Sequence, residues 1–222
     1  NKQSGLVTHP CSGNWSGTLA NALLHYDPSL ESLDRSGIVH RLDKNTSGLM
    51  VVAKNQKSQK YLVEQLQSHS ISREYSAIVY GHMISGGTIS EPLGRDPKDR
   101  VKQAVLRNGR EATTHYRVIN RFKSHTHVKA ILETGRTHQI RVHLSHIGHS
   151  LVGDSIYGGK VRYPKKASED LKNELFNFRR QALHSKKLTL KHPKSGELLS
   201  WKLPLPEDML KLLEVLTEFD KN

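Results

Sequence analysis

GIVHRLDKNTSG, at residues 37–48, runs directly into the apolar segment LMVVA at residues 49–53. A short, continuous apolar run is typical of a buried strand, whereas Asn, Thr, Ser and Gly are typical of a loop. We therefore predict a strand over residues 49–53, preceded by a loop that carries one carboxylate, Asp43, between Arg41 and Lys44. Nearby cations favour the charged form of an acid, so we expect Asp43 to stay ionised and to be available as a nucleophile or a base. The same local pattern also fits an alternative in which Asp43 is a structural loop residue held by an ion pair.

Patterns on both sides of this stretch predict helices and strands in no strict alternation. Residues 72–80 alternate in a way that is typical of a strand, and residues 56–69 place apolar side chains at helical spacing. Short polar links between neighbouring strands favour antiparallel pairing. The predicted fold class is therefore α+β, with a mixed, largely antiparallel β-sheet flanked by helices and loops. Other predicted elements are a short helix that Thr18 can cap, strands at 113–119, 126–132, 187–190 and 198–203, and helices at 138–147 and 206–219.

The predicted helix over residues 138–147 carries a candidate functional side chain. Ile140 and Leu144 belong to its buried stripe, and Arg141 lies one residue away from that stripe. Thr137 is suited to cap the helix, because a threonine hydroxyl can accept a hydrogen bond from the first helical amides. We therefore expect Arg141 at the edge of the core, where it can point into a cleft.

The chain of 222 residues is strongly basic, with 34 Lys and Arg against 21 Asp and Glu, a net charge of +13 and a pI near 9.8. A field of that size favours a polyanionic partner, and because the basic residues are spread along the chain we expect a folded basic face. Residues 81–109 predict an exposed excursion that contacts phosphate, although a merely solvated loop has the same composition. The basic residues of this segment are Arg95, Lys98, Arg100, Lys102 and Arg107.

A single cysteine, Cys11, excludes an internal disulfide and fits a reducing cytoplasm, where we expect the protein to act. No apolar run approaches the length of a membrane span and no signal peptide is evident, so we expect no membrane partner. The first residue is not Met, and we therefore expect a piece of a longer chain. The length suits one domain over residues 1–222, which we expect to be a monomer.

Two common kinds of site are not predicted. Four histidines crowd together, but no Cys, Asp or Glu lies among them and the neighbouring arginines repel a dication, so we predict no metal site. The glycine-rich segment 151–159 lacks the spacing of a phosphate loop or a dinucleotide fingerprint, so we predict no nucleotide cofactor. The four histidines are His138, His143, His146 and His149.

What remains is an acid in a basic setting, an aromatic residue on a neighbouring strand and an arginine on a helix: Asp43, Tyr75 and Arg141. This set suits chemistry on a nucleoside. An aromatic ring can stack on a base with about 1–3 kcal/mol, and the acid can attack or deprotonate the sugar or the base. The arginine would keep the acid charged and oriented. A base inside a stem must first be flipped out, and an inserted side chain can fill the gap.

Four motifs, in order along the chain, resemble those of the RluA family of pseudouridine synthases. Each motif alone is unspecific, whereas the ordered set covers nearly the whole chain and is highly specific. The motifs are HRLD at 40–43 with TSGL at 46–49, REY at 73–75, ETGRTHQIRVH at 133–143 continued by LVGD at 151–154 and YG at 157–158, and QALH at 181–184.

The resemblance implies an enzyme that isomerises specific uridines to pseudouridine in stem-loops of large-subunit (23S) ribosomal RNA, with no cofactor and no metal. It implies that Asp43 is the catalytic acid on a flipped-out uridine, that Tyr75 stacks on the uracil and that Arg141 is the partner of Asp43. Whether Asp43 attacks C1′ or transfers a proton at C2′ stays open. The other implied substrate-binding residues are Arg41, which would fill the space left by the base, Ile140 and Leu183, which would line the pocket, and His40, Arg136 and His138 within the motifs.

Family members often carry a small N-terminal S4-like RNA-binding domain, which the sequence lacks, so the resemblance implies a single catalytic domain over residues 1–222. Two other functions stay open. A non-catalytic module for ribosomal RNA binding or assembly would be indifferent to the loss of Asp43. A metal-dependent nuclease that uses the histidines would be sensitive to a chelator.

Overall fold

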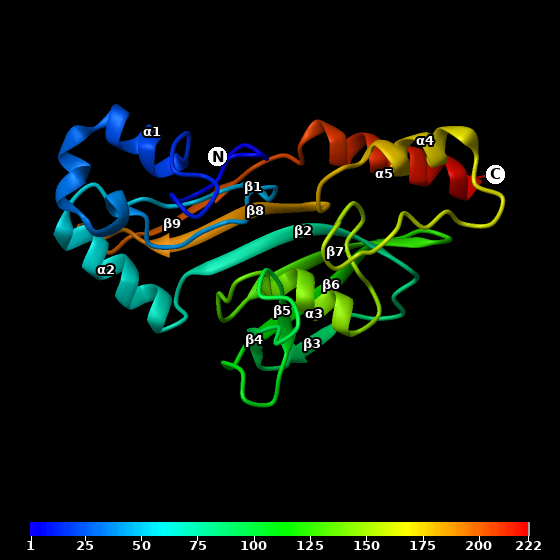
Figure 1. Ribbon diagram of the computed structural model, residues 1–222, viewed down its shortest axis with the longest axis horizontal. Coiled ribbons are helices and arrows are strands. Elements are labelled where there is room, and N and C mark those ends of the chain that lie inside the picture. Colours follow the sequence, from blue (N-terminus) through cyan, green and yellow to red (C-terminus); the bar gives the residue numbers. More distant parts are fainter. Residues whose placement is uncertain (222) are drawn as a thin grey trace. The chain divides into compact units, whose positions relative to one another are not determined.

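The computed structural model describes residues 1–221, which form two compact units (Figure 1). Unit 1 consists of Asn1–Arg73 and Ser185–Leu203, and unit 2 consists of Glu74–His184 and the segment from Pro204 onward. Two strands, β2 (Ser72–Tyr80) and β8 (Leu183–Lys191), each contribute residues to both units. The prediction of a single catalytic domain stays a prediction. Within residues 1–221 we find no helix of the length and apolarity needed to cross a membrane.

Unit 1 combines short helices with the β8–β9 hairpin. The threonine Thr18 begins α1 with a capping box, in which its side chain and that of Asn21 each bind the backbone of the other residue. The core of this unit contains Leu62 from α2 together with Leu188 and Leu190 from β8, each 2% exposed. The elements are α1 (Leu19–Tyr26), the 3₁₀ turns η1 (Pro28–Ser32) and η2 (Asp34–Gly37), β1 (Ser47–Gly48), α2 (Gln56–Gln67) and β9 (Leu198–Lys202), which pairs antiparallel with β8.

The predicted buried strand over residues 49–53 is wrong. The strand of this region is β1, which comprises only Ser47 and Gly48, and most of the apolar run after it is partly exposed. The amides of the run bind three unrelated acceptors: Leu49 N donates to Ser185 O (2.9 Å), Val51 N to His40 Nε2 (3.0 Å) and Ala53 N to Gly37 O (2.8 Å). Because one acceptor is a side chain and the other two belong to different segments, no regular ladder forms.

Unit 2 contains an antiparallel sheet with the strand order β2-β7-β6-β3. The strand β2 has the predicted bounds, and in its register with β7 Tyr75 lies opposite Ala130. The predicted pair at 113–119 and 126–132 is confirmed as neighbouring antiparallel strands. The strands are β3 (Gly87–Ser90), β6 (Thr113–Arg121) and β7 (His125–Leu132), and a separate pair is formed by β4 (Leu93–Arg95) and β5 (Gln103–Val105).

Three helices complete unit 2. The helices α4 (Glu169–Asn177) and α5 (Glu207–Lys221) lie side by side (Figure 1). Their apolar faces form a core with Ile78 of β2, in which several side chains are 0% exposed: Leu171, Leu175, Met209, Leu212 and Leu216. The third helix, α3 (Gln139–His146), buries Ile140 and Leu144. The α+β class with a largely antiparallel sheet is thereby confirmed.

The segment 81–109 contains more regular structure than the exposed basic segment that we predicted from the sequence. It contains β3, which extends the sheet, and the β4–β5 pair. Ile89 and Leu93 are 4% and 2% exposed, so the segment contributes to the core as well as to the surface. The sequence pattern did not predict this order, because the buried residues occur singly among Gly, Pro and charged residues.

Candidate functional site

The loop that carries Asp43 is held by the first residues of the chain. The carbonyl oxygen of Asp43 accepts a hydrogen bond from Thr46 N at 3.0 Å, which closes a turn. On the preceding residue, Leu42 O accepts from Thr8 Oγ1 at 2.8 Å. On the following residue, Lys44 O accepts from Gly5 N at 2.9 Å. The backbone around Asp43 is thus held on both sides, and the residue is partly exposed.

Lys2 anchors the same loop and was not foreseen from the sequence. It is only 4% exposed, and its ammonium group donates to Gln3 O (2.9 Å), Leu6 O (2.8 Å) and Lys44 O (3.0 Å). A buried charge is tolerated when its donors are satisfied, and a lysine has three of them. The backbone of Lys2 also exchanges two hydrogen bonds with Gly48, at 2.7 and 2.9 Å. A lysine near the start of a chain looks like any surface charge, so no sequence signal pointed to this role.

Gly48 is required where β1 approaches β8. Its φ of +113° is a backbone conformation that other residues rarely adopt, and a Cβ atom at this position would lie 2.2 Å from Ser185 O. The motif glycine therefore lets the end of the Asp43 loop pack directly against the backbone of β8.

His40 binds the backbone in this structure. Its Nε2 atom accepts the hydrogen bond from Val51 N, which requires an unprotonated nitrogen. Burial, aided by the charge of Arg73, lowers the pKa of His40 to about 4, so the ring is neutral at pH 7. The substrate-binding role implied by the resemblance stays a prediction, and the contact observed here stabilises the loop itself.

We expect the stability of the protein to fall as the pH drops from about 6.5 to about 4. In that range the unfolded chain takes up a proton on His40 that the folded chain does not, so stability is complete above the ordinary pKa and declines by up to about 1.4 kcal/mol per pH unit below it. His125, whose pKa burial also lowers to about 4, acts in the same direction. Urea midpoints at pH 7.5 and 5.0 measure the loss. In His40→Gln, which keeps an acceptor that cannot titrate, the loss should be smaller, and an equal loss would contradict the assignment.

Tyr75 is buried on β2, the strand that pairs with β7 in the unit 2 sheet. It is 5% exposed on β2, opposite Ala130, and alternation places it on the same face as Ala77 and Val79, as predicted. Its neighbour Glu74 points to the other face and pairs with Lys129 at 3.6 Å. The ring is therefore fixed by packing, which suits a stacking surface, and its contact with uracil stays a prediction.

The start of α3 corrects the predicted cap. Thr137 does not cap this helix, because the residue before its first turn is His138, which adopts a left-handed conformation with φ of 57° and makes no side-chain capping bond. The side chain of Gln139 anchors the turn in its place. Gln139 Oε1 accepts from Arg136 N (2.9 Å) and Thr134 Oγ1 (2.8 Å), and Gln139 Nε2 donates to Thr113 O (2.9 Å). The amide of Gln139 thus connects the turn, the helix and β6.

Arg141 is buried rather than placed at the edge of the core, with 4% of its surface exposed. Its Nε and Nη2 atoms donate to the two carboxylate oxygens of Asp154 at 2.7 and 2.9 Å. Burial by itself would raise the pKa of Asp154. The hydrogen bonds and charge of Arg141, with the amides of Tyr157 and Ile156, outweigh burial and hold that pKa below its ordinary value. Both partners are therefore charged, and the bidentate contact fixes the plane of the guanidinium.

The predicted site residues are divided between the units. Arg41 is exposed, whereas Ile140 and Leu183 are each 4% exposed and offer apolar side chains. Arg136 Nε donates to Glu111 O at 3.0 Å, and His138 Nδ1 is hydrogen-bonded to the hydroxyl of Tyr157 at 2.7 Å. Unit 1 holds Asp43, Arg41 and His40, and unit 2 holds Tyr75, Arg136, His138, Ile140, Arg141 and Leu183.

Among the clustered histidines, hydrogen bonds to protein groups are formed by His138, as described above, and by His143 and His149. His143 is hydrogen-bonded through Nδ1 to Thr114 Oγ1 (2.9 Å) and through Nε2 to Glu91 O (3.0 Å), and His149 Nδ1 is hydrogen-bonded to Tyr80 O (2.9 Å). Over residues 1–221, no three His, Cys, Asp or Glu side chains are grouped so that they could hold a metal ion. The histidines thus connect α3 and its following turn to the sheet strands and loops of unit 2.

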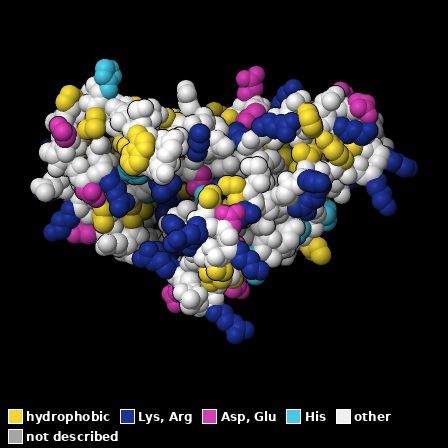
Figure 2. Space-filling view, in the orientation of Figure 1, with side chains coloured by type: hydrophobic (Ala, Val, Ile, Leu, Met, Phe, Trp, Pro, Cys, Tyr) yellow, Lys and Arg dark blue, Asp and Glu magenta, His cyan; other side chains and the backbone are white. Residues whose placement is uncertain are grey.

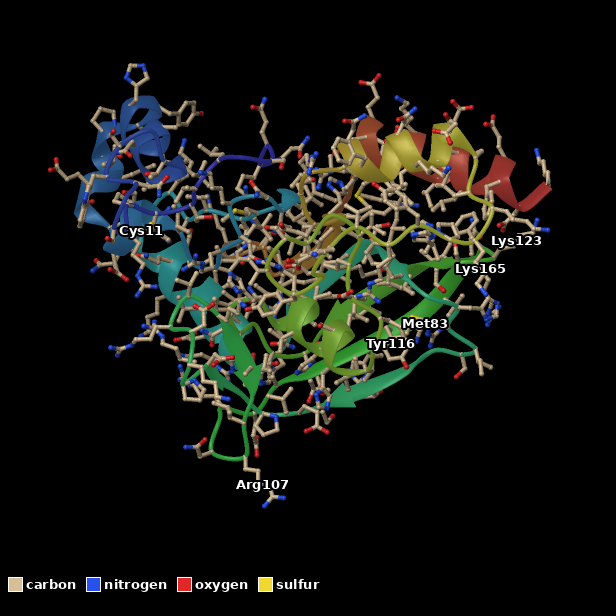
Figure 3. All side chains as sticks on the ribbon, turned by 45° about the vertical axis from the view of Figure 1, so that its right-hand side comes forward. Cys11, Met83, Arg107, Tyr116, Lys123 and Lys165 are labelled. Carbon is tan, nitrogen blue, oxygen red and sulfur yellow. The ribbon has the colours of Figure 1, made fainter. Side chains whose placement is uncertain are left out.

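Basic side chains are spread over the protein surface. Figure 2 shows Lys and Arg side chains at many places on one face. Arg107 is exposed, and Figure 3 shows its side chain extending outward from the turn that follows β5. This distribution agrees with a folded surface that attracts a polyanion.

Comparison with known proteins yields consistent matches. A family model described as RNA pseudouridylate synthase matches residues 1–146. Ribosomal large subunit pseudouridine synthase D of Pseudomonas aeruginosa is 54% identical over 217 residues, which are 98% of this chain and 68% of that protein. The protein of the same name from Escherichia coli strain K12 is 54% identical over 216 residues, 97% of this chain and 66% of that protein. The chain thus spans about two thirds of the length of these relatives.

Two solved structures have a similar fold. Human RNA pseudouridylate synthase domain containing 4 is 27% identical, with a TM-score of 0.70, and the match covers 97% of this chain and 88% of that one. Human RNA pseudouridylate synthase domain containing 1 has a TM-score of 0.65 at 24% identity over 90% of this chain and 85% of that one, which shows the fold alone.

Proposed function

Because the chain belongs to the RNA pseudouridylate synthase family, we propose that it isomerises uridine to pseudouridine in large-subunit ribosomal RNA. The substrate is inferred from the names of the bacterial relatives, which are 54% identical to this chain. The observation that carries the proposal is the Asp43 loop, in which the backbone is held by Lys2, Gly5 and Thr8 while the acid is partly exposed. Rigid support of a reactive carboxylate is what such chemistry requires.

The proposed reaction needs one acid and no added atoms. The bond between C1′ and N1 breaks, the base turns, a bond forms between C1′ and C5, and the proton from C5 is balanced by the proton that N1 gains. Asp43 either attacks C1′ and is later displaced, or moves a proton at C2′, and both routes start from the ionised acid. Tyr75 would stack on the uracil, and Arg141 would act as the partner of Asp43.

The family resemblance implies roles for three further residues. Arg41 is exposed on the Asp43 loop and would fill the space that a flipped-out base leaves in a stem. Ile140 and Leu183 are apolar and would line the pocket of the base.

We also propose that the protein acts in the cytoplasm as a monomer. One cysteine fits a reducing compartment, and ribosomal RNA is the substrate in the names of the bacterial relatives.

Pseudouridine mapping on an unmodified transcript tests the function. Large-subunit ribosomal RNA made by transcription in vitro contains uridine at every site, so we expect the purified protein to introduce pseudouridine at a small number of defined positions. The same yield is expected in the presence of a chelator. RNA binding without any pseudouridine would identify a non-catalytic binding module, and cleavage abolished by the chelator would identify a metal-dependent nuclease.

We expect the affinity for RNA to fall steeply with salt. Neutralising phosphates releases counterions, so the slope of log K against log salt is about −0.7 to −0.9 per phosphate contacted. Four contacts correspond to a loss of about 100-fold between 50 and 200 mM salt. Binding titrations at four salt concentrations give the slope. Arg95→Gln with Lys98→Gln should reduce it, whereas Lys211→Gln, on α5, serves as the control. A response that is flat in salt would remove the basic surface from the proposal.

A further inference from the structure

The guanidinium of Arg141 is held by a bidentate contact with Asp154. Asp154, 2% exposed, receives four hydrogen bonds on its carboxylate: two from Arg141 and one each from Ile156 N (3.0 Å) and Tyr157 N (3.1 Å). The two backbone amides hold the carboxylate in place independently of the arginine. A bidentate pair fixes the plane of a guanidinium as well as its position, which a single point contact does not do.

Tyr157 supports the same group from its face. The Cζ atom of Arg141 lies 5.0 Å from the ring centroid of Tyr157, within the range of a cation–π contact. The hydroxyl of Tyr157 is fixed in turn, because it accepts from Gln103 N at 2.9 Å and is hydrogen-bonded to His138 Nδ1 at 2.7 Å. We call Asp154 and Tyr157 together the arginine seat. The seat engages Nε and Nη2 of Arg141, and the third nitrogen, Nη1, lies outside the Asp154 pair.

We propose that Asp154 is a positioning residue for the reaction, which acts by holding the guanidinium of Arg141 in the orientation that its partner acid requires. This inference rests on the proposed role of Arg141 as the partner of Asp43. Asp154 is not assigned a contact with RNA. It acts only through the arginine, so its removal should affect turnover and leave substrate binding unchanged.

Stability alone does not explain such a pair. Taking two charges out of water is costly, and replacing a buried ion pair by apolar residues of similar volume is often neutral or stabilising. An orienting role does explain it, because groups that stabilise charge in a transition state are effective when they are fixed before the reaction. The carboxylate also compensates the buried cation, so that Arg141 stays inside the protein without leaving an unpaired charge.

Kinetics on an unmodified fragment of ribosomal RNA test the positioning role. Asp154→Asn keeps the shape and the acceptor for the two amides, but it loses the charge and one half of the bidentate pair. We expect its kcat to fall about 100-fold while KM and the RNA Kd change less than about twofold. In an Arg141→Met background, Asp154→Asn should change kcat by less than about twofold, because the residue through which it acts is gone. An unchanged kcat in Asp154→Asn, or equal losses in both backgrounds, would overturn the proposal.

Unfolding measurements test the pair without reference to activity. In the wild-type background, Asp154→Asn leaves the buried cation of Arg141 without its counterion, so the urea midpoint should fall. In the Arg141→Met background the same change removes a buried anion that has lost its partner, so the midpoint should rise. A shift of the same sign in both backgrounds would show that Asp154 does not act through Arg141. The matched control is Asp208→Asn, which breaks the bidentate Arg180–Asp208 pair (2.6 and 2.7 Å) and should lower the midpoint while kcat stays within about twofold.

The kinetic and unfolding experiments together distinguish failure of this inference from failure of the proposed function. If Asp43→Asn abolishes activity but Asp154→Asn does not lower kcat, the function stands and the positioning role is wrong. If the wild-type protein forms no pseudouridine, the proposed function is wrong and the positioning role of Asp154 is wrong with it, whatever the unfolding cycle shows about the pair.

Discussion

Asp43→Asn should abolish pseudouridine formation, lowering kcat by at least about 10³-fold while the fold and the RNA affinity persist. The change keeps the volume of the side chain and removes the charge that both proposed routes need. Groups that transfer protons contribute about 10²–10⁴-fold to a rate, and loss of a nucleophile costs at least as much. Release of tritium from RNA labelled at C5 of uridine measures the rate directly, because the isomerisation replaces that hydrogen.

Asp34→Asn is the matched control for this experiment. Asp34 belongs to the same unit as Asp43, but its side chain is 83% exposed and lies 3.9 Å from Arg35 in a surface ion pair. Surface pairs of this kind contribute little, so the control should keep the wild-type rate. Wild-type turnover in a folded Asp43→Asn variant would reject the enzymatic role of this acid and favour a binding module.

Arg141→Met should have the next largest effect, with a loss in kcat of at least about 100-fold, no smaller than that expected for Asp154→Asn. The substitution removes the cation that is proposed to keep Asp43 charged and aimed. It also leaves the buried Asp154 carboxylate without its partner, and breaking a buried pair costs about 3–5 kcal/mol of stability. Kinetics should therefore be run at a temperature at which circular dichroism shows the variant folded.

Arg141→Lys separates charge from geometry. Lysine keeps the positive charge but cannot form two parallel bonds to a carboxylate. We expect its kcat to lie between those of the wild type and Arg141→Met, because the cation remains while its orientation is lost. Undiminished turnover in a folded Arg141→Met variant would argue against the pairing with Asp43.

Elements with a local pattern could be predicted from the sequence. The strand β2 has the predicted bounds, and α2, α5 and the β8–β9 hairpin lie where periodicity placed them. In these elements, alternation or helical spacing of apolar residues coincides with a buried face. The family was also predicted, because ordered motifs over nearly the whole chain constrain it far more tightly than any single residue does, and the comparisons confirm it.

Predictions failed where hydrogen bonds came from distant residues. The apolar run 49–53 has the composition of a strand, but its amides bind His40, Gly37 and Ser185. Thr137 is a residue type that favours a helix cap, but the start of α3 is held by the side chain of Gln139, which also donates to Thr113 O on β6, 26 positions away. In both places the local propensity was correct for an isolated peptide and was overruled by a partner elsewhere in the fold.

The sequence by itself determined the fold class, the family and the candidate residues, because these depend on local pattern and on the order of motifs. Only the tertiary structure decided what holds those residues: Lys2 beneath the Asp43 loop, and Asp154 with Tyr157 around Arg141. The physical reason is that a buried charge must be paired or hydrogen-bonded, and its partner is selected by proximity in space. Lys2 and Lys44 are 42 positions apart, and Arg141 and Asp154 are 13 apart, and neither spacing is a pattern that a sequence can reveal.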